Sequence, residues 1–185
     1  MAHAFLEMLH DEHEKVKKTF EKLTDETASM DEKDRLFEEL RSDILPHMKG
    51  EEKLFYPKLL QDVDHAMFNA YEAIEEHKVA KNVLAQLEDA TFKDIRWDAK
   101  LYVLKELVEH HIKDEEGKVY KDAKKLLSDE ELDDIQTRYE ELKTMAMNET
   151  QTLRGTPGYK REDRTETAAT ERLETEEAPR YRSQS

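Results

Sequence analysis

The sequence predicts an all-α protein, with an up-down-up-down four-helix bundle, an additional C-terminal helix and a disordered tail. The chain of 185 residues contains only 4 Gly and 4 Pro, and Glu, Lys, Leu and Ala are plentiful. This composition favours helices over sheets. Apolar residues recur at steps of three and four in successive stretches, so they share one helical face in each. The first four stretches are joined by short connections, which favours antiparallel neighbours.

The first two helices are predicted over residues 4–23 and 33–60. The inward face of the first consists of Leu6, Leu9, His13, Val16, Phe20 and Leu23. The second follows the same rhythm with Phe37, Leu40, Ile44, His47, Glu51 and Leu54. Pro46 predicts a kink just before His47, and Pro57 predicts an end or a bend after Tyr56. Because the apolar stripe continues through Pro46, we expect one kinked helix there.

Three further helices complete the prediction. The third covers residues 64–87, with the inward residues Ala70, Ala73, His77, Ala80, Leu84 and Leu87. The fourth covers residues 93–127, with Trp97, Leu101, Leu104, Val108, His111 and Glu115. The fifth begins after Ser128, a suitable N-cap because Glu131 stands three residues further on. Its apolar face consists of Leu132, Ile135, Tyr139, Leu142 and Ala146.

These elements divide the chain into three parts. We expect the bundle over residues 1–127, an additional amphipathic helix over residues 128–147, and a polar tail over residues 148–185. The tail contains few large apolar residues, mixed charges and many Thr. It cannot bury enough apolar surface to offset the entropy of ordering, so it is predicted to be disordered. The sequence does not indicate a protein partner for the tail.

Charge and composition exclude several classes of protein. The formal net charge is −15 and 41% of the residues are charged, which argues against nucleic acid and anionic membrane surfaces as partners. Without Cys there is no disulfide framework, iron–sulfur cluster or Cys-type zinc site. No stretch is apolar enough to span a bilayer, and no signal-peptide pattern follows Met1. We therefore expect a cytoplasmic protein.

Each helix of the predicted bundle carries one His where a core Leu would otherwise fit, namely His13, His47, His77 and His111. Their spacings are 34, 30 and 34 residues, so the first and third, and the second and fourth, are both 64 residues apart. The segments HMKGEEKLFY and HIKDEEGKVY repeat at the same distance. This pattern places the four imidazoles at one level of the core. Glu51 and Glu115 join them, one helical turn further along the same inward faces.

The chemistry of these six residues indicates a metal site. An unpaired buried carboxylate is very costly, whereas a metal converts His and Glu into ligands. Six protein ligands are too many for a tetrahedral zinc and suit two metals bridged by carboxylates. Imidazole and carboxylate together favour iron, manganese or zinc over calcium or magnesium. The alternative is an acidic helical protein that binds no metal.

Several neighbouring residues allow two interpretations. Glu52 and Glu116 are rotated by about 100° from the ligand face, so they either support the ligands or face solvent. Glu12 and Glu76 either orient imidazoles or face solvent. Tyr56 and Tyr120 also repeat and are interpreted as packing residues. His10 lies one turn before His13 and is a weaker candidate for an additional ligand or a gate.

At these residues the sequence resembles the hemerythrin-like, or HHE cation-binding, family in its bacterial single-domain form. The family pattern is one His on the first helix, His-x-x-x-Glu on the second, one His on the third and His-x-x-x-Glu on the fourth. The matching residues here are His13, His47 with Glu51, His77, and His111 with Glu115. The resemblance covers about residues 3–127. It implies a non-haem di-iron centre, oxo- or hydroxo-bridged, in which the two Glu bridge both irons.

The chain departs from the oxygen-carrying members of this family. Their third helix supplies two His as His-x-x-x-His, whereas Ala73 and Lys81 stand at those offsets from His77. Their fourth helix has His-x-x-x-x-Asp in place of His-x-x-x-Glu. One terminal ligand is therefore missing, and Ala70, Ala73 and Ala80 leave space for solvent or a small ligand. Lys81 either faces a bound anion or extends to water.

These features predict a di-iron protein that binds dioxygen or a related diatomic molecule in the bundle core, for sensing, storage or buffering. The alternative is a di-iron redox enzyme that acts on peroxide or nitric oxide, or a protein that handles iron for repair. The missing His on the third helix favours this alternative, because open coordination positions permit exchange. No catalytic acid or base stands out in the sequence.

Overall fold

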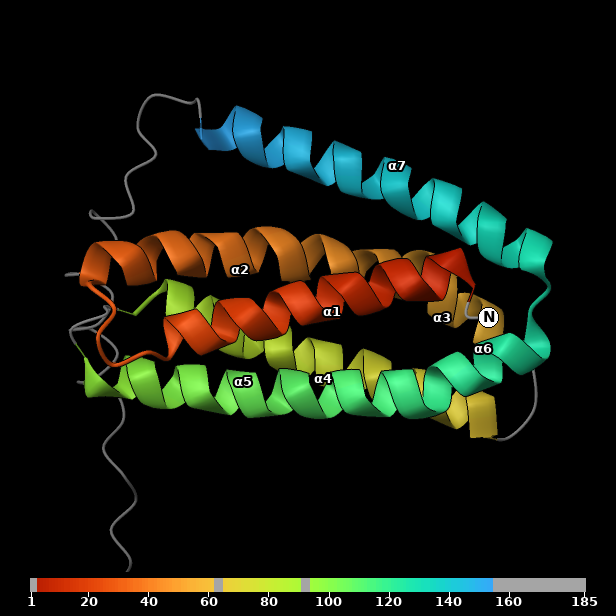
Figure 1. Cartoon of the computed structure of the whole chain (residues 1–185), viewed down its shortest axis with the longest axis horizontal. Helices are drawn as coiled ribbons and strands as arrows, with labels where there is room; N and C mark the ends of the chain where they lie inside the picture. Colours follow the sequence, from red (N-terminus) through yellow and green to blue (C-terminus); the bar gives the residue numbers. More distant parts are fainter. Residues whose placement is uncertain (1–2, 62–64, 91–93, 155–185) are drawn as a thin grey trace, which may run out of the picture.

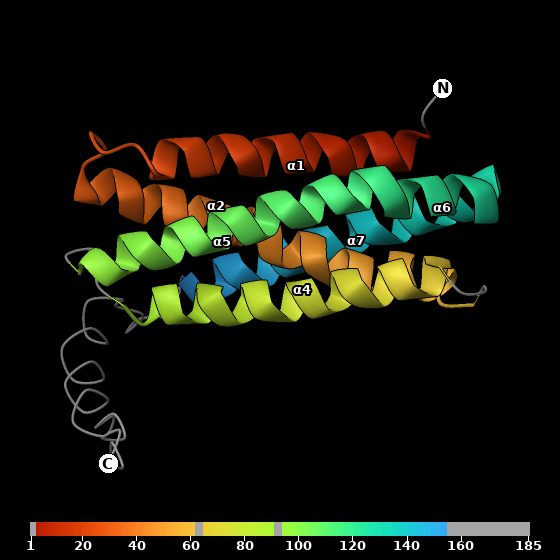
Figure 2. The ribbon, with the colours of Figure 1, turned by 90° about the horizontal axis from the view of Figure 1, so that it is seen from below.

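The chain has the predicted all-α architecture. The computed structural model describes residues 3–61, 65–90 and 94–154, and side chains up to residue 146. Four long helices form a bundle in which sequential neighbours run antiparallel (Figure 1, Figure 2): α1 (Ala4–Leu23), α2 (Met30–Gly50), α4 (His65–Glu88) and α5 (Ile95–Asp114). No strand occurs among the described residues. None of the helices in this part of the chain has the length and apolar character needed to cross a bilayer.

The second and fourth predicted helices are each divided by a short π-helical turn. The resulting segments are η1 (Glu51–Phe55), α3 (Tyr56–Leu59), η2 (Glu115–Val119) and α6 (Tyr120–Leu126). The backbone N–H of Tyr56 donates to the carbonyl of Glu51, five residues earlier, and Tyr120 donates to Glu115 in the same way. The two π turns lie 64 residues apart, so the repeat seen in the sequence extends to the backbone.

The π turn changes which residues face the core after Glu51. A π turn holds more residues than an α turn. As a result Phe55 and Tyr56 are fully buried, whereas Leu54, which was predicted to face the core, is only partly buried. The uniform helical rhythm used in the prediction could not detect this shift of register.

Pro46 does not divide the second helix, as predicted, and Pro57 does not end it. α2 runs from Met30 to Gly50 through Pro46 as one helix. Pro57 is the second residue of α3, and the helix runs past it to Leu59. The chain after Tyr56 therefore continues as a helix, and Pro57 stands at the start of a segment rather than at an end.

α7 (Asp129–Arg154) lies outside the bundle and packs against α1, α2 and η1 (Figure 1). Its start agrees with the predicted capping box: the Glu131 N–H donates to Ser128 Oγ at 3.2 Å, and the Ser128 N–H donates to Glu131 Oε2 at 3.0 Å. The helix runs through residues 148–154, which were predicted to belong to the tail. That stretch contains no Gly or Pro, whereas Gly155 and Pro157 follow it. Residues 155–185 of the predicted tail lie outside the described residues.

The apolar core consists of two clusters at the two ends of the bundle. One contains the C-terminal half of α1 and the N-terminal half of α5, with Phe20, Phe37 and Trp97 among its buried rings. The other contains the N-terminal half of α1, with η1, η2 and α7, and includes Phe5 and Tyr139. The predicted His and Glu residues occupy the layer between the two clusters. Apolar packing on both sides therefore fixes how the four helices are aligned along the bundle axis at this layer.

Close approach of α7 requires a glycine at position 50. A Cβ atom built on Gly50 would lie 2.3 Å from Cε2 of Tyr139. The Tyr139 side chain is fully buried, so its ring has little freedom to move. By contrast, a Cβ atom on Gly117 would meet no atom within 4 Å.

We expect Gly50→Ala to destabilise the protein. Overpacking costs about 1–3 kcal/mol, against a gain in helix propensity of about 1 kcal/mol. Gly117→Ala receives that gain without a clash and is the matched control. Urea unfolding of both variants measures the difference in the free energy of unfolding. Equal stability of the two variants would show that Tyr139 does not press on Gly50.

Candidate metal centre

The structure brings the six predicted residues together in one buried layer. The side chains come from four different helices and the two π turns, and none is more than 5% exposed: His13, His47, His77, His111, Glu51 and Glu115. They form two groups of potential ligand atoms that share Glu51. One group contains His13, His47, Glu51 and Glu115, and the other contains Glu51, His77 and His111.

The imidazoles meet in two pairs. His13 Nε2 lies 3.0 Å from His47 Nε2, and His77 Nε2 lies 3.0 Å from His111 Nε2. Each pair joins two helices that are adjacent in sequence, α1 with α2 and α4 with α5. All four Nε2 atoms therefore point into the centre of the layer.

The two buried carboxylates lie between these pairs. Glu51 Oε1 is 2.9 Å from His47 Nε2, and Glu51 Oε2 is 3.5 Å from His77 Nε2. Glu115 Oε2 is 3.2 Å from His13 Nε2 and 3.8 Å from His111 Nε2. Each carboxylate thus contacts one imidazole of each pair, which is the placement that a bridging ligand requires.

Four other glutamates fix the outer edges of the imidazole rings. Each Nδ1 atom lies 2.9–3.0 Å from a carboxylate oxygen, in the pairs His13–Glu116, His47–Glu12, His77–Glu52 and His111–Glu76. Each glutamate comes from a different part of the chain than its imidazole. Glu12 and Glu76 belong to another helix of the bundle, and Glu52 and Glu116 belong to the π turns that continue other helices. The interpretation of these glutamates as solvated residues is therefore wrong, and each one orients an imidazole.

This arrangement leaves lone pairs facing one another. A carboxylate at 2.9 Å favours the tautomer in which Nδ1 carries the proton, so Nε2 is then an acceptor. Two such acceptors 3.0 Å apart, beside a carboxylate, repel unless a proton or a metal ion lies between them. Glu51 Oε1 and Glu115 Oε2 are buried and accept no hydrogen bond, although imidazole nitrogens lie close by. The donor set therefore fits metal ions, because imidazole and carboxylate are both their ligands.

The charges of the layer are strongly coupled. Burial lowers the pKa of His47, but the carboxylates of Glu51 and Glu12 outweigh it and raise the pKa to about 10. Burial also lowers the pKa of His77, and here the net shift is downward. Burial would raise the pKa of Glu115, yet the neighbouring imidazoles hold it well below its usual range. The two imidazole pairs are thus in unequal electrostatic surroundings.

The sequence profile of the hemerythrin HHE cation-binding domain matches residues 4–123. The chain belongs to the hemerythrin HHE family. The matched segment holds both imidazole pairs and both buried carboxylates, so the His/Glu cluster fits a metal-binding domain of this family.

The fold is also that of a solved member of the family. The crystal structure of a hemerythrin HHE cation-binding-domain-containing protein from Mycobacterium kansasii superposes with a TM-score of 0.71. The alignment covers 84% of this chain and 94% of the other, at 22% sequence identity. At that identity the likeness concerns the fold alone. No curated protein matches the chain significantly.

Two tyrosines that were not assigned to this HHE centre from the sequence contact its residues. The Tyr56 hydroxyl donates to Glu115 Oε1 at 2.8 Å and lies 3.4 Å from Glu51 Oε2, so Tyr56 is more than a packing residue. The Tyr139 hydroxyl, from α7, donates to Glu12 Oε2 at 2.8 Å and lies 3.0 Å from His47 Nδ1. The repeat of Tyr56 at Tyr120 was the available signal for the first. Nothing in the sequence indicated the second, since it depends on how α7 docks.

The remaining candidates lie outside the layer. His10 is half exposed, and its Nδ1 lies 3.0 Å from Glu116 Oε1. It belongs to neither group of potential ligand atoms, so its contact is with a glutamate that orients His13. Lys81 donates to both oxygens of Glu52, at 2.7 and 2.9 Å. It therefore supports the partner of His77 and does not face the centre.

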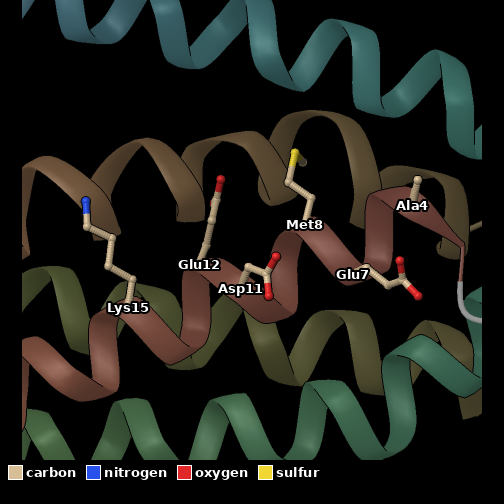
Figure 3. Close-up of a pocket in the computed structure, with 6 residues that line it drawn as sticks. All are labelled: Ala4, Glu7, Met8, Asp11, Glu12 and Lys15. Atoms are coloured by element: carbon tan, nitrogen blue, oxygen red, sulfur yellow. The ribbon is translucent and has the colours of Figure 1, made fainter.

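The surface is hollowed on two sides of the centre. Figure 3 shows a hollow lined by six side chains that all come from α1, including Glu12 but none of the six residues of the layer. A narrower groove of about 10 Å³ lies between α4 and η2, and its lining includes His111 and Glu115. Only the second of these reaches the candidate ligands.

We expect the metal-free chain to lose stability as the pH falls from about 4.5 toward about 2. Burial would raise the pKa values of Glu12, Glu52 and Glu116, but imidazole partners, joined by a lysine at Glu12 and at Glu52, lower each of them from 4.5 to about 2. A carboxyl group with a lowered folded-state pKa contributes stability above its unfolded pKa and loses it as the pH falls through the folded value. Denaturant unfolding followed by circular dichroism measures this profile. Glu12→Gln should flatten the acid limb, whereas the exposed Glu141→Gln should not, and identical profiles for both would contradict the assignment.

Proposed function

We propose that the protein is a non-haem di-iron protein that binds a small oxidant, dioxygen or a related diatomic molecule, for sensing, storage or buffering. One observation carries the proposal: two pairs of inward Nε2 atoms flank two buried carboxylates whose inner oxygens accept no hydrogen bond. Membership of a cation-binding family supports it.

The residues fit two metal ions better than one. His13 and His47 would hold one ion, and His77 and His111 the other. Glu51 and Glu115 would bridge the two, because each contacts an imidazole of both pairs. Neutral imidazole together with carboxylate is typical of iron sites that carry out oxygen chemistry. When bound, a pair of iron ions supplies the electrons that a small oxidant accepts.

The chain contributes geometry, charge and exclusion of water. The four outer glutamates hold the imidazoles in one orientation, so the Nε2 lone pairs are directed inward before any ion arrives. Glu51 and Glu115 would offset two of the four positive charges of a pair of divalent ions, and the four outer glutamates add further negative charge around them. The apolar clusters on both sides of the layer keep bulk water away from the centre.

We expect two irons per chain after iron-replete expression, with ferric absorption bands that reductant bleaches. His111→Ala should lose at least one iron per chain because it removes half of an imidazole pair. His65→Ala is the control, since that exposed side chain at the start of α4 lies outside both groups of ligand atoms. Metal analysis and absorption spectra measure the metal content and the ferric bands. A single zinc per chain, or equal metal content in both variants, would refute the di-iron proposal.

A redox enzyme acting on peroxide or nitric oxide is the second candidate, and Tyr56 favours it. Its hydroxyl is a buried O–H donor in contact with a bridging carboxylate. Burial, together with the negative charge of Glu115 and Glu51, raises the pKa of this hydroxyl well above its usual value. Tyr56 therefore keeps its proton at neutral pH and can donate a hydrogen bond to an oxygen on which negative charge develops.

For an enzyme that acts on peroxide, Tyr56→Phe should lower the turnover of peroxide by about 10²-fold or more, the usual effect of removing a positioned hydrogen-bond donor. Tyr120→Phe is the control, because the buried Tyr120 hydroxyl bonds to none of the described residues. Initial rates per bound iron measure the effect. Equal rates in the two variants would remove Tyr56 from the reaction, and a stable oxygenated spectrum without turnover would favour the binding protein.

A further inference from the structure

We propose that divalent metal ions reach the centre through the groove between α4 and η2, at the half that holds His77 and His111. The inference rests on the proposed function, because it concerns how the resident metal is loaded. It identifies one acidic route for metal ions. It also implies that solvent ions can reach one half of the nearly duplicated centre more easily than the other half.

The groove connects the surface with the candidate ligands. Its lining residues are Asn69, Glu72, Ala73, Glu76, His111, Asp114, Glu115, Lys118 and Val119. Its volume of about 10 Å³ holds about one water molecule. At its inner end lies Glu115, whose Oε2 is buried and accepts no hydrogen bond. Glu115 Oε2 lies 3.2 Å from His13 Nε2 and 3.8 Å from His111 Nε2. An ion that passes along the groove therefore arrives at a candidate ligand that contacts both imidazole pairs.

The 64-residue repeat allows the two halves to be compared position by position. Polar or small residues of the groove correspond to larger or apolar residues in the other half: Asn69 to Phe5, Glu72 to Met8, Ala73 to Leu9, Lys118 to Leu54, and Val119 to Phe55. The ligand positions are the same in both halves. At the candidate centre the ligand types are therefore conserved between the halves, whereas the residues along the path to the ligands differ.

The half with His13 and His47 is closed by α7. The ring of Tyr139 lies over Gly50, with its centroid 5.7 Å from that of Phe5, and its hydroxyl bonds to Glu12. Lys143 adds a second bond from α7 to Glu12, at 2.6 Å. The hollow over α1 in Figure 3 reaches Glu12 and none of the candidate ligands. The residue that corresponds to Gly50 in the other half is Asp114. Asp114 lines the groove, and none of the groove's lining residues comes from α7.

The charges along the groove suit a divalent cation. Glu72, Glu76 and Asp114 line it, and carboxylate oxygens can replace the waters that an ion loses on the way in. Grooves lined by one sign of charge also raise the local concentration of the opposite ion. The cationic residue of the lining is Lys118, whose Nζ lies 2.6 Å from Asp114 and 3.8 Å from Glu72. Because its side chain is 48% exposed, Lys118 can turn toward solvent when an incoming ion takes its place.

The rate at which the metal-free chain takes up Co²⁺ tests the proposal, with stopped-flow absorption as the readout. We expect Lys118→Met to speed uptake and Glu72→Gln to slow it, each by about thirtyfold, the effect of one unit charge on a divalent ion at about 4 Å in water. The controls are Arg35→Met and Glu39→Gln, which make the same changes of charge in an exposed pair of α2. Circular dichroism confirms that all four variants are folded.

The outcomes separate the route from the function. Opposite shifts at Lys118 and Glu72, with parent rates in the α2 controls, support the route. Parent rates in all variants, or equal shifts in the controls, overturn it. The final amount bound tests the proposed function: two ions per chain at equilibrium support it, whatever the rate. A parent chain that takes up no metal would overturn both.

Discussion

One electrostatic constraint governs the layer of six residues. The fold holds imidazole lone pairs and carboxylates close together, although these groups repel one another. Two Nε2 pairs at 3.0 Å and two carboxylates with unpartnered oxygens form no stable apolar core by themselves. Apolar clusters above and below the layer, and the glutamates that bind each Nδ1, keep these groups in place. The core therefore uses packing energy to hold an arrangement that only a cation fully satisfies.

The paired π turns belong to the same arrangement. Glu51 and Glu115 are each the first residue of a π turn, and a tyrosine follows five residues later. The wider turn allows the carboxylate and that tyrosine to be buried together, which a regular helix with 3.6 residues per turn does not favour at this spacing. Through this geometry Tyr56 reaches Glu115 on the opposite side of the bundle.

The sequence predicted the fold and the composition of the layer because both follow from local periodicity and from the 64-residue repeat. It did not predict which glutamate would orient which imidazole, because the partners lie on different helices: Glu12 contacts His47, 35 residues away. Nor did it place Tyr139, whose contact with Glu12 spans 127 residues. A contact of this kind is set by the docking of a whole helix on the bundle, and helical rhythm contains no information about it.

The departure from symmetry is as informative as the repeat. The two halves share their ligand types and π turns, yet one has Gly50 and an apolar rim, and the other has Asp114, Glu72 and Lys118. A glycine at position 50 lets a ring from α7 cover the first half, whereas the charged residues of the second half line a narrow groove. The helix added after the bundle therefore does more than stabilise it. By covering one half, α7 leaves the acidic groove of the other half as the path by which solvent ions approach the duplicated centre.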